Sequence, residues 1–491
     1  MSRLTCVRST LLTLLAIVVT AGCTSRTPET QLIQDAADAV GGADRILAVR
    51  TLTLEGAGSN GSLGQGFLPG GPLWDVPLTE SSRAIDLENQ RMRVRHTRTV
   101  TYPFPSQKVT KIDASLDGDV AFNVTPAGMT VRNNERVAGY RRIEMLHHPL
   151  TLLRAALTEG ATISNLRQDG NLQVVDVSPA GGGDVVILAV DGTTKLPASA
   201  TSHSYDANLG DVDIVTTFSE YEEVSGLKLP RHVASTIDKL PQWDIRVVKN
   251  TIDEDIGDLA APDAIRVAPA PPVEAPAIVT VDDLGPGLWR LAGQTHNSVV
   301  VEFADHLTLI EAPNNQTRTL AVIAKARELR PGKPLTNVIV THHHFDHLGG
   351  LRAAVSEGLT IVAPANYEPL LRDLTGRKHT VVQDVLAKNP KPLTFQGVDD
   401  ALTMKDAMNE VRIYNQSGNT HVQGLLFAHM PRQQVLYEAD VFGTYLTHPW
   451  IDNFNEHLQK RGIRVQRFVP THGAMKTQAD YLQVLKTADR N

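Results

Sequence analysis

The feature that most restricts the possible folds of this chain is the segment NVIVTHHHFDHLGG at residues 337–350. NVIVT is a continuous apolar run, which is typical of a strand buried on both faces. Four histidines and one aspartate follow it within six residues. Because layered α/β sheets place their sites at the carboxyl ends of core strands, the segment predicts a functional site at such an end.

The spacing of these polar residues suits a metal site. His342 and His344 are two positions apart, so both rings point the same way in an extended segment. A helical site would use a spacing of four instead. The turn that follows can direct Asp346 and His347 toward a second position nearby. His343 points to the opposite side of the strand, and we expect it to have a supporting or structural role.

Composition limits the chemistry. The length of 491 residues predicts two or three domains. A net charge of −7 offers no broad basic surface for a nucleic-acid backbone, so a small-molecule substrate is expected. Cys6 and Cys23 are the only cysteines, and both lie near the N-terminus. The mature chain therefore has no disulfide and no thiolate ligand, and any metal must be held by histidine and carboxylate.

The N-terminus has the zones of an export signal. Arg3 and Arg8 precede the run STLLTLLAIVVT, which is too short to span a bilayer comfortably, and AGC follows it. The small residues before Cys23 resemble the lipobox of bacterial lipoproteins. That resemblance implies a signal peptide at residues 1–22, an acylated Cys23 and a chain anchored in the bacterial cell envelope, facing the periplasm or the exterior. A simply cleaved signal is the alternative.

The N-terminal half is predicted to be rich in β-strands. Apolar residues recur on one face of residues 29–48, which predicts a helix that stops at Gly41-Gly42. From residue 52 to 258, runs such as RMRVRHTRTV and DVVILAVDG lie between Asp-Gly and Gly-rich turns, as strands do. One helix is predicted at 141–158. We expect a large antiparallel sheet over residues 29–265, loosely similar to the curved-sheet lipoprotein-carrier fold; its role and partner are not indicated.

A change in composition marks a domain boundary. VAPAPPVEAP, Val267–Pro276, contains four prolines and predicts an extended spacer, so we place a linker at 266–282. Beyond it strands and helices alternate, which predicts a layered α/β domain at 283–491. The expected strands are 287–291, 298–303, 308–311, 337–341 and 360–363, and the expected helices are 317–329 and 349–357.

The pattern H-x-H-x-D-H followed by Gly-Gly resembles the signature of the metallo-β-lactamase-fold superfamily. That family has three further ligands in order, and this chain has SGNTHVQG with His421, VLYEADVF with Asp440 and VPTHG with His472. The resemblance covers about residues 283–491. It implies an α+β fold class: a C-terminal αββα sandwich, preceded here by a β-rich domain with one or two helices.

The resemblance also implies a role for each matched residue. The ligands of the first metal are His342, His344 and His421. The ligands of the second metal are Asp346, His347 and His472, and Asp440 bridges the two. Ligation by nitrogen and oxygen suits zinc, about two ions per chain, with iron or manganese as alternatives.

The implied reaction is hydrolysis. A metal pair lowers the pKa of a bound water from about 16 to about 7, and Asp346 is the expected catalytic residue that orients this nucleophile or carries its proton. A bridging aspartate favours an ester, lactone, thioester or related bond. The alternatives are a mononuclear iron oxidoreductase of the sulfur dioxygenase type and a β-lactam hydrolase. A non-catalytic binding role stays open for the N-terminal half.

Three other features receive weaker predictions. Glu311 ends an apolar run, LTLIE, where the family has an acidic residue that supports the ligands; a plain surface glutamate is the alternative. His296 lines the mouth of the site or is structural. The His147-His148 pair has no nearby acidic ligand pattern in the sequence and is expected to be structural. The segment between residues 363 and 421 is expected to carry lid helices that select the substrate.

Overall fold

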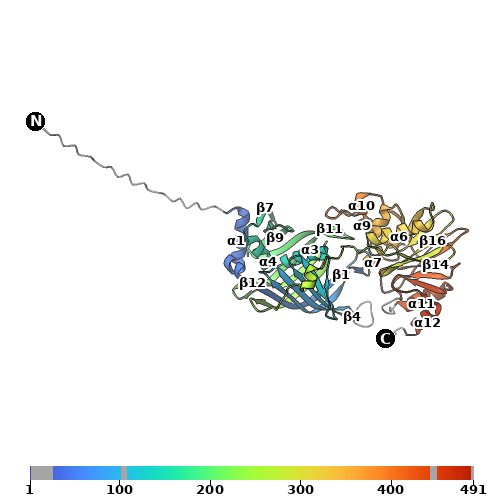
Figure 1. Cartoon of the computed structure of the whole chain (residues 1–491), viewed down its shortest axis with the longest axis horizontal. Helices are drawn as coiled ribbons and strands as arrows, with labels where there is room; N and C mark the ends of the chain where they lie inside the picture. The colour runs from blue at the N-terminus through green and yellow to red at the C-terminus, as the bar shows by residue number, and fades with distance from the viewer. Residues whose placement is uncertain (2–25, 101–107, 443–449, 488–491) are drawn as a thin grey trace.

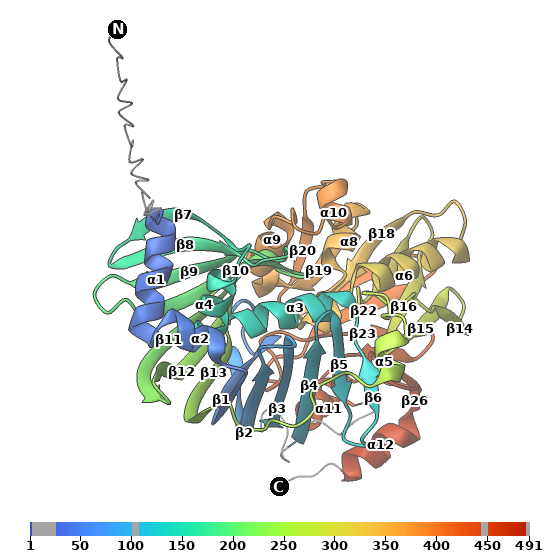
Figure 2. The same ribbon diagram turned by 60° about the vertical axis from the view of Figure 1, so that its left-hand side comes forward.

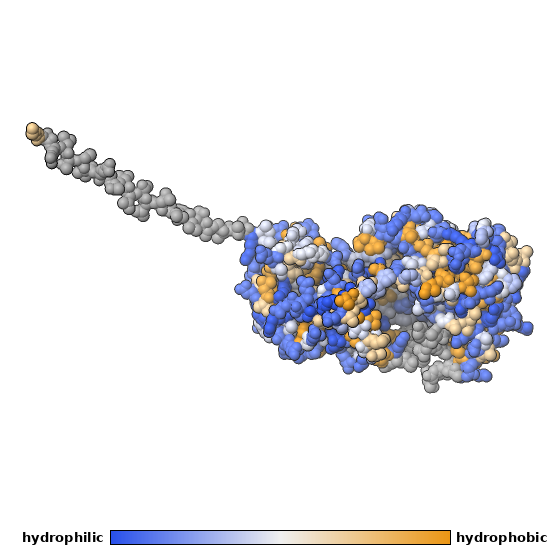
Figure 3. Space-filling view, in the orientation of Figure 1, coloured by the Kyte–Doolittle hydropathy of each residue, from blue (hydrophilic) through white to orange (hydrophobic). Residues whose placement is uncertain are grey.

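A computed structural model describes Met1 and residues 26–100, 108–442 and 450–487. Residues 2–22 of the predicted signal peptide and Cys23 lie outside the described residues. Among the described residues, no helix combines the length and apolar character needed to cross a membrane. A curved-sheet domain and a two-sheet domain lie side by side (Figure 1). On the face shown in Figure 3, hydrophobic residues form small patches among hydrophilic ones.

The described part of the chain begins with two short helices instead of one. Thr27 caps α1 (Pro28–Val40) by accepting a hydrogen bond from the Thr30 amide, and Pro28 suits the first helical position. The helix ends at Gly41, whose φ of 142° is a conformation that glycine adopts readily. The chain then resumes as α2 (Ala43–Ala48). The predicted stop at Gly41-Gly42 is therefore a break within the predicted helix.

Thirteen antiparallel strands form one sheet, which confirms the predicted β-rich domain. In chain order they are β1 (Thr51–Gly66), β2 (Leu73–Asp86), β3 (Arg91–Val100), β4 (Lys108–Asp117), β5 (Val120–Val124), β6 (Thr130–Arg132), β7 (Thr162–Asp169), β8 (Leu172–Ser178), β9 (Val186–Asp191), β10 (Pro197–Asp206), β11 (Gly210–Val224), β12 (Leu227–Ile237) and β13 (Leu240–Ile252). Strands β1 and β13 pair at the centre, and β6 and β7 are the edges.

A helical pair connects the two edge strands, where one helix was predicted. Helix α3 (Glu135–Leu146) is capped by His147, and α4 (Pro149–Leu157) begins two residues after this cap. The break follows from Pro149, which has no N–H to continue a helix and disfavours a helical residue before it. The His148 ring caps α4 by accepting from the Leu150 amide at 3.2 Å. This pair is structural, as predicted.

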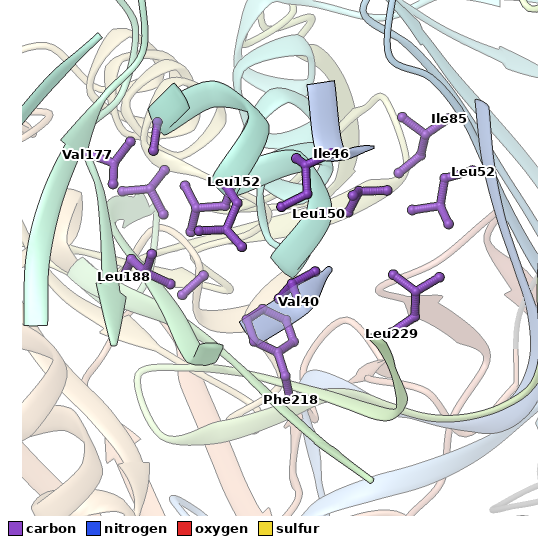
Figure 4. Close-up of a cluster of buried hydrophobic side chains, with 14 of the residues drawn as sticks. Val40, Ile46, Leu52, Ile85, Leu150, Leu152, Val177, Leu188, Phe218 and Leu229 are labelled. Carbon is purple, nitrogen blue, oxygen red and sulfur yellow. The ribbon is translucent and has the colours of Figure 1, made fainter. Parts of the chain in front are cut away.

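The concave face of the sheet packs against the helices (Figure 2). Figure 4 shows Leu150 and Leu152 of α4 between strands from the two sides of the sheet, with Leu188 on one side and Leu52 on the other. These side chains are fully buried. Burying one leucine contributes about 1.5–3 kcal/mol to the stability of the folded state. By burying these leucines against both sides of the sheet, the helices stabilise its curved form.

The predicted linker is partly attached to the sheet. Helix α5 (Asp263–Val267) lies beside the sheet edge, where Arg132 donates hydrogen bonds to the carbonyls of Ile265, Arg266 and Ala268. The following residues are irregular until β14 begins at Thr280, which is a few residues earlier than the predicted domain start.

The C-terminal domain contains two facing mixed sheets. The first has seven strands: β14 (Thr280–Gly285), β15 (Leu288–Gly293), β16 (His296–Glu302), β17 (Leu307–Ile310), β18 (Leu335–Ile339), β19 (Thr360–Pro364) and β20 (Thr394–Val398). The second has six: β21 (Ala401–Lys405), β22 (Glu410–Asn415), β23 (Leu426–Met430), β24 (Val435–Glu438), β25 (Arg467–Pro470) and β26 (Lys476–Thr477). Buried side chains of both sheets meet between them.

Helices cover the outer face of each sheet, which confirms the predicted αββα sandwich. On the first sheet these are α6 (Gln316–Leu329), α8 (Leu351–Ser356) and α9 (Glu368–Gly376), and on the second they are α11 (Ile451–Lys460) and α12 (Gln478–Thr487). The predicted lid segment contains η1 (Ala365–Tyr367), α9, α10 (Val385–Lys388) and strands β20–β22. A short helix, α7 (Phe345–Leu348), follows the histidine run at the junction of the two domains (Figure 1).

Candidate metal centre

Two groups of metal-binding side chains lie at the strand ends of the sandwich. The first, here called the first cluster, comprises His342, His344, His421 and Asp440. The second, here called the second cluster, comprises His296, Asp346, His347 and His472. Within each cluster the possible ligand atoms lie within 4.8 Å of one another. The structure thus brings together all seven ligands named from the sequence and adds His296.

Five of the cluster side chains sit on loops that leave buried strands, whereas Asp346 and His347 lie in α7 and His296 begins β16. His342 and His344 follow β18, His421 follows β22, Asp440 follows β24 and His472 follows β25. These strands are mostly buried, so the loops start from fixed points. Asn297 fixes one of them, because its side-chain amide donates to the carbonyls of Pro470 and Gly473 at 2.8 Å each.

Asp440 lies between the two clusters. Its Oδ2 is 3.1 Å from His421 Nε2 and 3.4 Å from His342 Nε2. The same oxygen is 3.2 Å from His347 Nε2, and Oδ1 is 3.2 Å from His472 Nε2. One carboxylate therefore faces ligands of both clusters, the position that the sequence assigned to a bridge. Its backbone φ of +58° is uncommon for a non-glycine residue and is typical of functional sites.

The donor atoms fit metal ions. The buried ring nitrogens without a hydrogen bond of good geometry include His296 Nε2, His342 Nε2, His344 Nδ1 and His347 Nε2. Buried polar atoms are rarely left in this state, and neutral imidazole nitrogen is a common ligand for divalent transition metals. With carboxylate oxygens beside them, the clusters indicate sites for cations such as zinc.

Electrostatics at the centre favours cations. Burial lowers the pKa of His342 and of His344 well below the usual value, so both rings are neutral ligands. Burial also lowers the pKa of His472, but the Asp346 and Asp440 carboxylates outweigh it and raise the pKa to about 9. The His472 ring is therefore protonated at neutral pH in the metal-free centre, and a metal ion bound there would displace this proton.

Glu311 supports the second cluster. The side chain is fully buried, and its Oε2 accepts a hydrogen bond from Thr341 Oγ1 at 2.7 Å. The same oxygen is 3.2 Å from His347 Nδ1. This contact places the proton of His347 on Nδ1 and turns Nε2 toward the cluster. Glu311 therefore occupies the supporting position that the sequence suggested.

His343 points away from both clusters. Its Nε2 donates to the Gly66 carbonyl at 2.9 Å, and its Nδ1 is 3.1 Å from the Tyr367 hydroxyl. Burial lowers the pKa of this ring to about 4. The alternation of side chains along the extended segment accounts for this placement.

Sequence reasoning missed several residues that shape the centre. Asn419 accepts hydrogen bonds from the backbone amides of His421 and Val422 and so fixes the turn that carries His421. Its position two residues before a histidine is a local signal that could have been used. Gln65 and Trp74 of the N-terminal domain also reach the centre. They are more than 250 residues away in sequence and carry no local motif.

Comparison with known proteins indicates the same superfamily as the sequence signature. The model of the metallo-beta-lactamase superfamily matches residues 292–391. A linear primary-alkylsulfatase from Pseudomonas sp is 31% identical over 97 residues, which are 18% of this chain and 13% of that protein. An (R)-specific secondary-alkylsulfatase from Pseudomonas sp is 24% identical over 152 residues, which are 30% of this chain and 21% of that protein. The chain therefore spans only a small part of these relatives.

A solved structure shows a partial likeness to this chain. A metallo-beta-lactamase from Pontibacter korlensis is 17% identical, and the likeness covers 43% of this chain and 100% of that chain with a TM-score of 0.32. The matched family segment includes the run from His342 to His347 that carries the signature. As that signature predicted, the C-terminal half of this chain contains a metallo-beta-lactamase superfamily domain.

Proposed function

We propose that the protein is a hydrolase that uses two divalent metal ions, of which zinc is the first candidate. The observation that carries the proposal is the position of Asp440, whose two carboxylate oxygens face ligands of both clusters. A single-metal site on this fold does not need His347 and His472, the second-cluster side chains that Asp440 also faces. The absence of cysteine from residues 24–491 leaves histidine nitrogen and carboxylate oxygen as ligands, which suits zinc.

In the proposed reaction, the bound ions and Asp346 have different roles. The chemistry that such ions supply when bound is Lewis acidity and a water of lowered pKa. Asp346 is the side chain placed to orient a water and accept its proton, because its Oδ2 faces the centre at 3.4 Å from His347 Nε2. Burial raises the pKa of Asp346, but His347 and hydrogen bonds with its histidine neighbours lower it well below the usual range. The carboxylate is therefore in its basic form.

The bond to be cleaved is an ester, a lactone, a thioester or a related bond. The partial likeness to two alkylsulfatases adds alkyl sulfate esters to this group. All of these substrates develop negative charge on an oxygen or sulfur as the bond breaks, and cations at the clusters would stabilise that charge. We propose a small-molecule substrate on this basis.

The test is a substrate panel with the metal-loaded full chain. It should include simple esters, lactones, thioesters, phosphodiesters and alkyl sulfates, with metal quantification on the same preparation. We expect hydrolysis of at least one class and about two zinc ions per chain. Hydrolysis that survives complete removal of metal would refute the mechanism. One iron per chain without zinc uptake would favour the mononuclear iron oxidoreductase instead.

A substitution at Asp346 tests the proposed proton transfer. Asp346→Asn keeps the size of the side chain but removes its basic oxygen. We expect turnover to fall about 100-fold or more, because general acid–base steps contribute on that scale. Asp305→Asn, at an exposed turn away from the clusters, is the control and should leave turnover unchanged. Equal turnover in the two variants, with metal content preserved, would contradict the role of Asp346.

A further inference from the structure

The hairpin between β1 and β2 extends from the N-terminal sheet to the metal centre. Its end, Gly61–Trp74, is here called the tip. The regular pairing of the two strands stops at Gly61 and resumes only at Gly66, opposite Leu73. Gly64 lies against the ring of Phe345 with a φ of +71°, and a Cβ there would come within 2.3 Å of the ring. Glycine is therefore required for this approach.

The tip provides hydrogen-bond acceptors to the loops that carry the first cluster. The Gly66 carbonyl lies 3.2 Å from His344 Nε2, while His344 Nδ1 lies on the side without a partner. A metal-ligating histidine usually donates its other N–H to a carbonyl or carboxylate in this way. The Phe67 carbonyl accepts from the Gln423 amide at 2.7 Å, two residues beyond His421.

The tip also contacts the second cluster. Gln65 Nε2 donates to Asp346 Oδ1 at 3.0 Å. The other oxygen of Asp346, Oδ2, faces the rings of His296, His347 and His472 at 3.4–3.5 Å. The amide of Gln65 therefore selects which carboxylate oxygen faces the centre. Without it, Asp346 could rotate about its side-chain bonds, because its side chain is 38% exposed.

The Trp74 ring lies beside the first cluster. Its ring is edge-to-face with the ring of His344 at 5.9 Å and with the ring of His421 at 6.4 Å. The ring of Trp450 stacks on the ring of His421 at 4.5 Å. An indole next to the ligands offers apolar contact area beside the reacting atoms.

We propose that the tip is part of the catalytic site, so that the active centre is built from both domains. Gln65 and the Gly66 carbonyl position Asp346 and His344, and Trp74 contacts an apolar group of the substrate. This inference rests on the proposed hydrolase function only for the role of Trp74 and for the kinetic effects. The positioning role concerns the metal centre itself and has its own readout.

The first test uses the full chain loaded with Co²⁺, whose visible absorption reports the geometry of its ligands. Gln65→Ala removes the donor to Asp346, and we expect the cobalt spectrum to change. Gln168→Ala is the matched control. Gln168 lies on the edge strand β7, and within the described structure its Nε2 donates only to the Gly170 carbonyl. An unchanged spectrum in Gln65→Ala, with unchanged metal content, would overturn the positioning role.

The second test is kinetic and applies to whichever substrate the panel finds. Gln65→Ala should lower kcat about 10–100-fold, as outer-sphere substitutions do, with little change in KM. Trp74→Ala should raise KM more than it lowers kcat, and more strongly for substrates with a larger apolar group. Trp243→Ala, within the sheet domain, is its control. Unchanged kinetics in both tip variants would overturn the proposal.

A third variant displaces the whole tip. Gly64→Val places a branched side chain where the Phe345 ring lies, so we expect combined losses of both kinds, with circular dichroism and thermal unfolding showing that the sheet domain is still folded. If the wild type hydrolyses nothing in the panel, the proposed function fails while the cobalt spectra still decide the tip contact. Normal hydrolysis by Gly64→Val would show that the site does not need the tip.

Discussion

Glu311 allows a quantitative prediction about how the second cluster holds its metal. Its Oε2 accepts from Thr341 Oγ1 at 2.7 Å and faces His347 Nδ1 at 3.2 Å, and its Oε1 lies 3.4 Å from the Thr341 amide nitrogen. The Thr471 hydroxyl also donates to Oε2, at 3.4 Å. Because all four neighbouring groups are donors, only a group that accepts at both oxygens satisfies them. A carboxylate does this, and an amide of the same shape does not.

Glu311→Gln therefore creates a conflict in either orientation of the amide. If the NH₂ group faces His347, the ring must accept at Nδ1 and carry its proton on Nε2, which is the nitrogen turned toward the cluster. If it faces the Thr341 amide, two donors meet in a buried site. Substitutions in the outer sphere cost about 10–100-fold in metal affinity, and at about 1.4 kcal/mol for each tenfold this is about 1.4–2.8 kcal/mol.

A competition titration with a chromophoric chelator measures the effect. We expect metal binding at the second cluster to weaken by this amount and binding at the first cluster to change little, because the ligand that Glu311 contacts is His347 of the second cluster. Glu302→Gln is the control: this buried glutamate pairs with Arg330 and Lys333 at the other end of β16 from His296. It should lower the free energy of unfolding without changing metal affinity. Two unchanged binding steps in Glu311→Gln would refute the reasoning.

Three further predictions concern the rest of the chain. Limited proteolysis should cut first within Val267–Pro276 and leave a C-terminal fragment that still binds metal, because all the ligands follow the cut; loss of metal from that fragment would contradict this. Cys23→Ala should release the protein from the membrane fraction of the cell envelope, whereas a wild type that is already soluble would rule out the lipid anchor. Acid should destabilise the sheet domain below about pH 6.5, because burial lowers the pKa of His147 to about 4 and of His148 to about 3, so only the unfolded chain takes up these protons. Urea unfolding at two pH values should show a smaller loss in His148→Asn, which keeps a cap acceptor for α4 but does not titrate; an equal loss would contradict the assignment.

Local patterns were sufficient to predict which of the consecutive histidines lie together. His342 and His344 were assigned to one side of the chain from strand periodicity alone, and the structure places them in one cluster with His343 on the other side. Helix α6, predicted at 317–329, is observed at Gln316–Leu329 for the same reason, because its periodic pattern has clear ends. Such features depend on residues that are neighbours in sequence.

Several contacts between residues distant in sequence, for which neither a local pattern nor the family signature gave a position, were not predicted. His296 joined the second cluster because β16 lies beside β17, whose end carries Glu311, and no spacing rule connects it to Asp346. Gln65 meets Asp346 across 281 positions. The curvature that brings β1 to the sandwich arises from the packing of the whole sheet on α1 and α4, which a single strand pattern does not contain.

The linker is hydrogen-bonded to the sheet domain at one end and to the sandwich at the other, so the free segment between the two domains is very short. The Ala268 carbonyl is bonded to Arg132 of the sheet domain, and the Glu274 carboxylate accepts from Thr317 of the sandwich. Only residues 269–273 lie between these bonds, and fully extended they reach roughly 17 Å. A tether of this length holds the tip at an effective concentration on the order of millimolar near the metal centre. Weak individual contacts are therefore enough to keep it docked, and a separate peptide with the sequence of the tip would need a comparable concentration to occupy the same place.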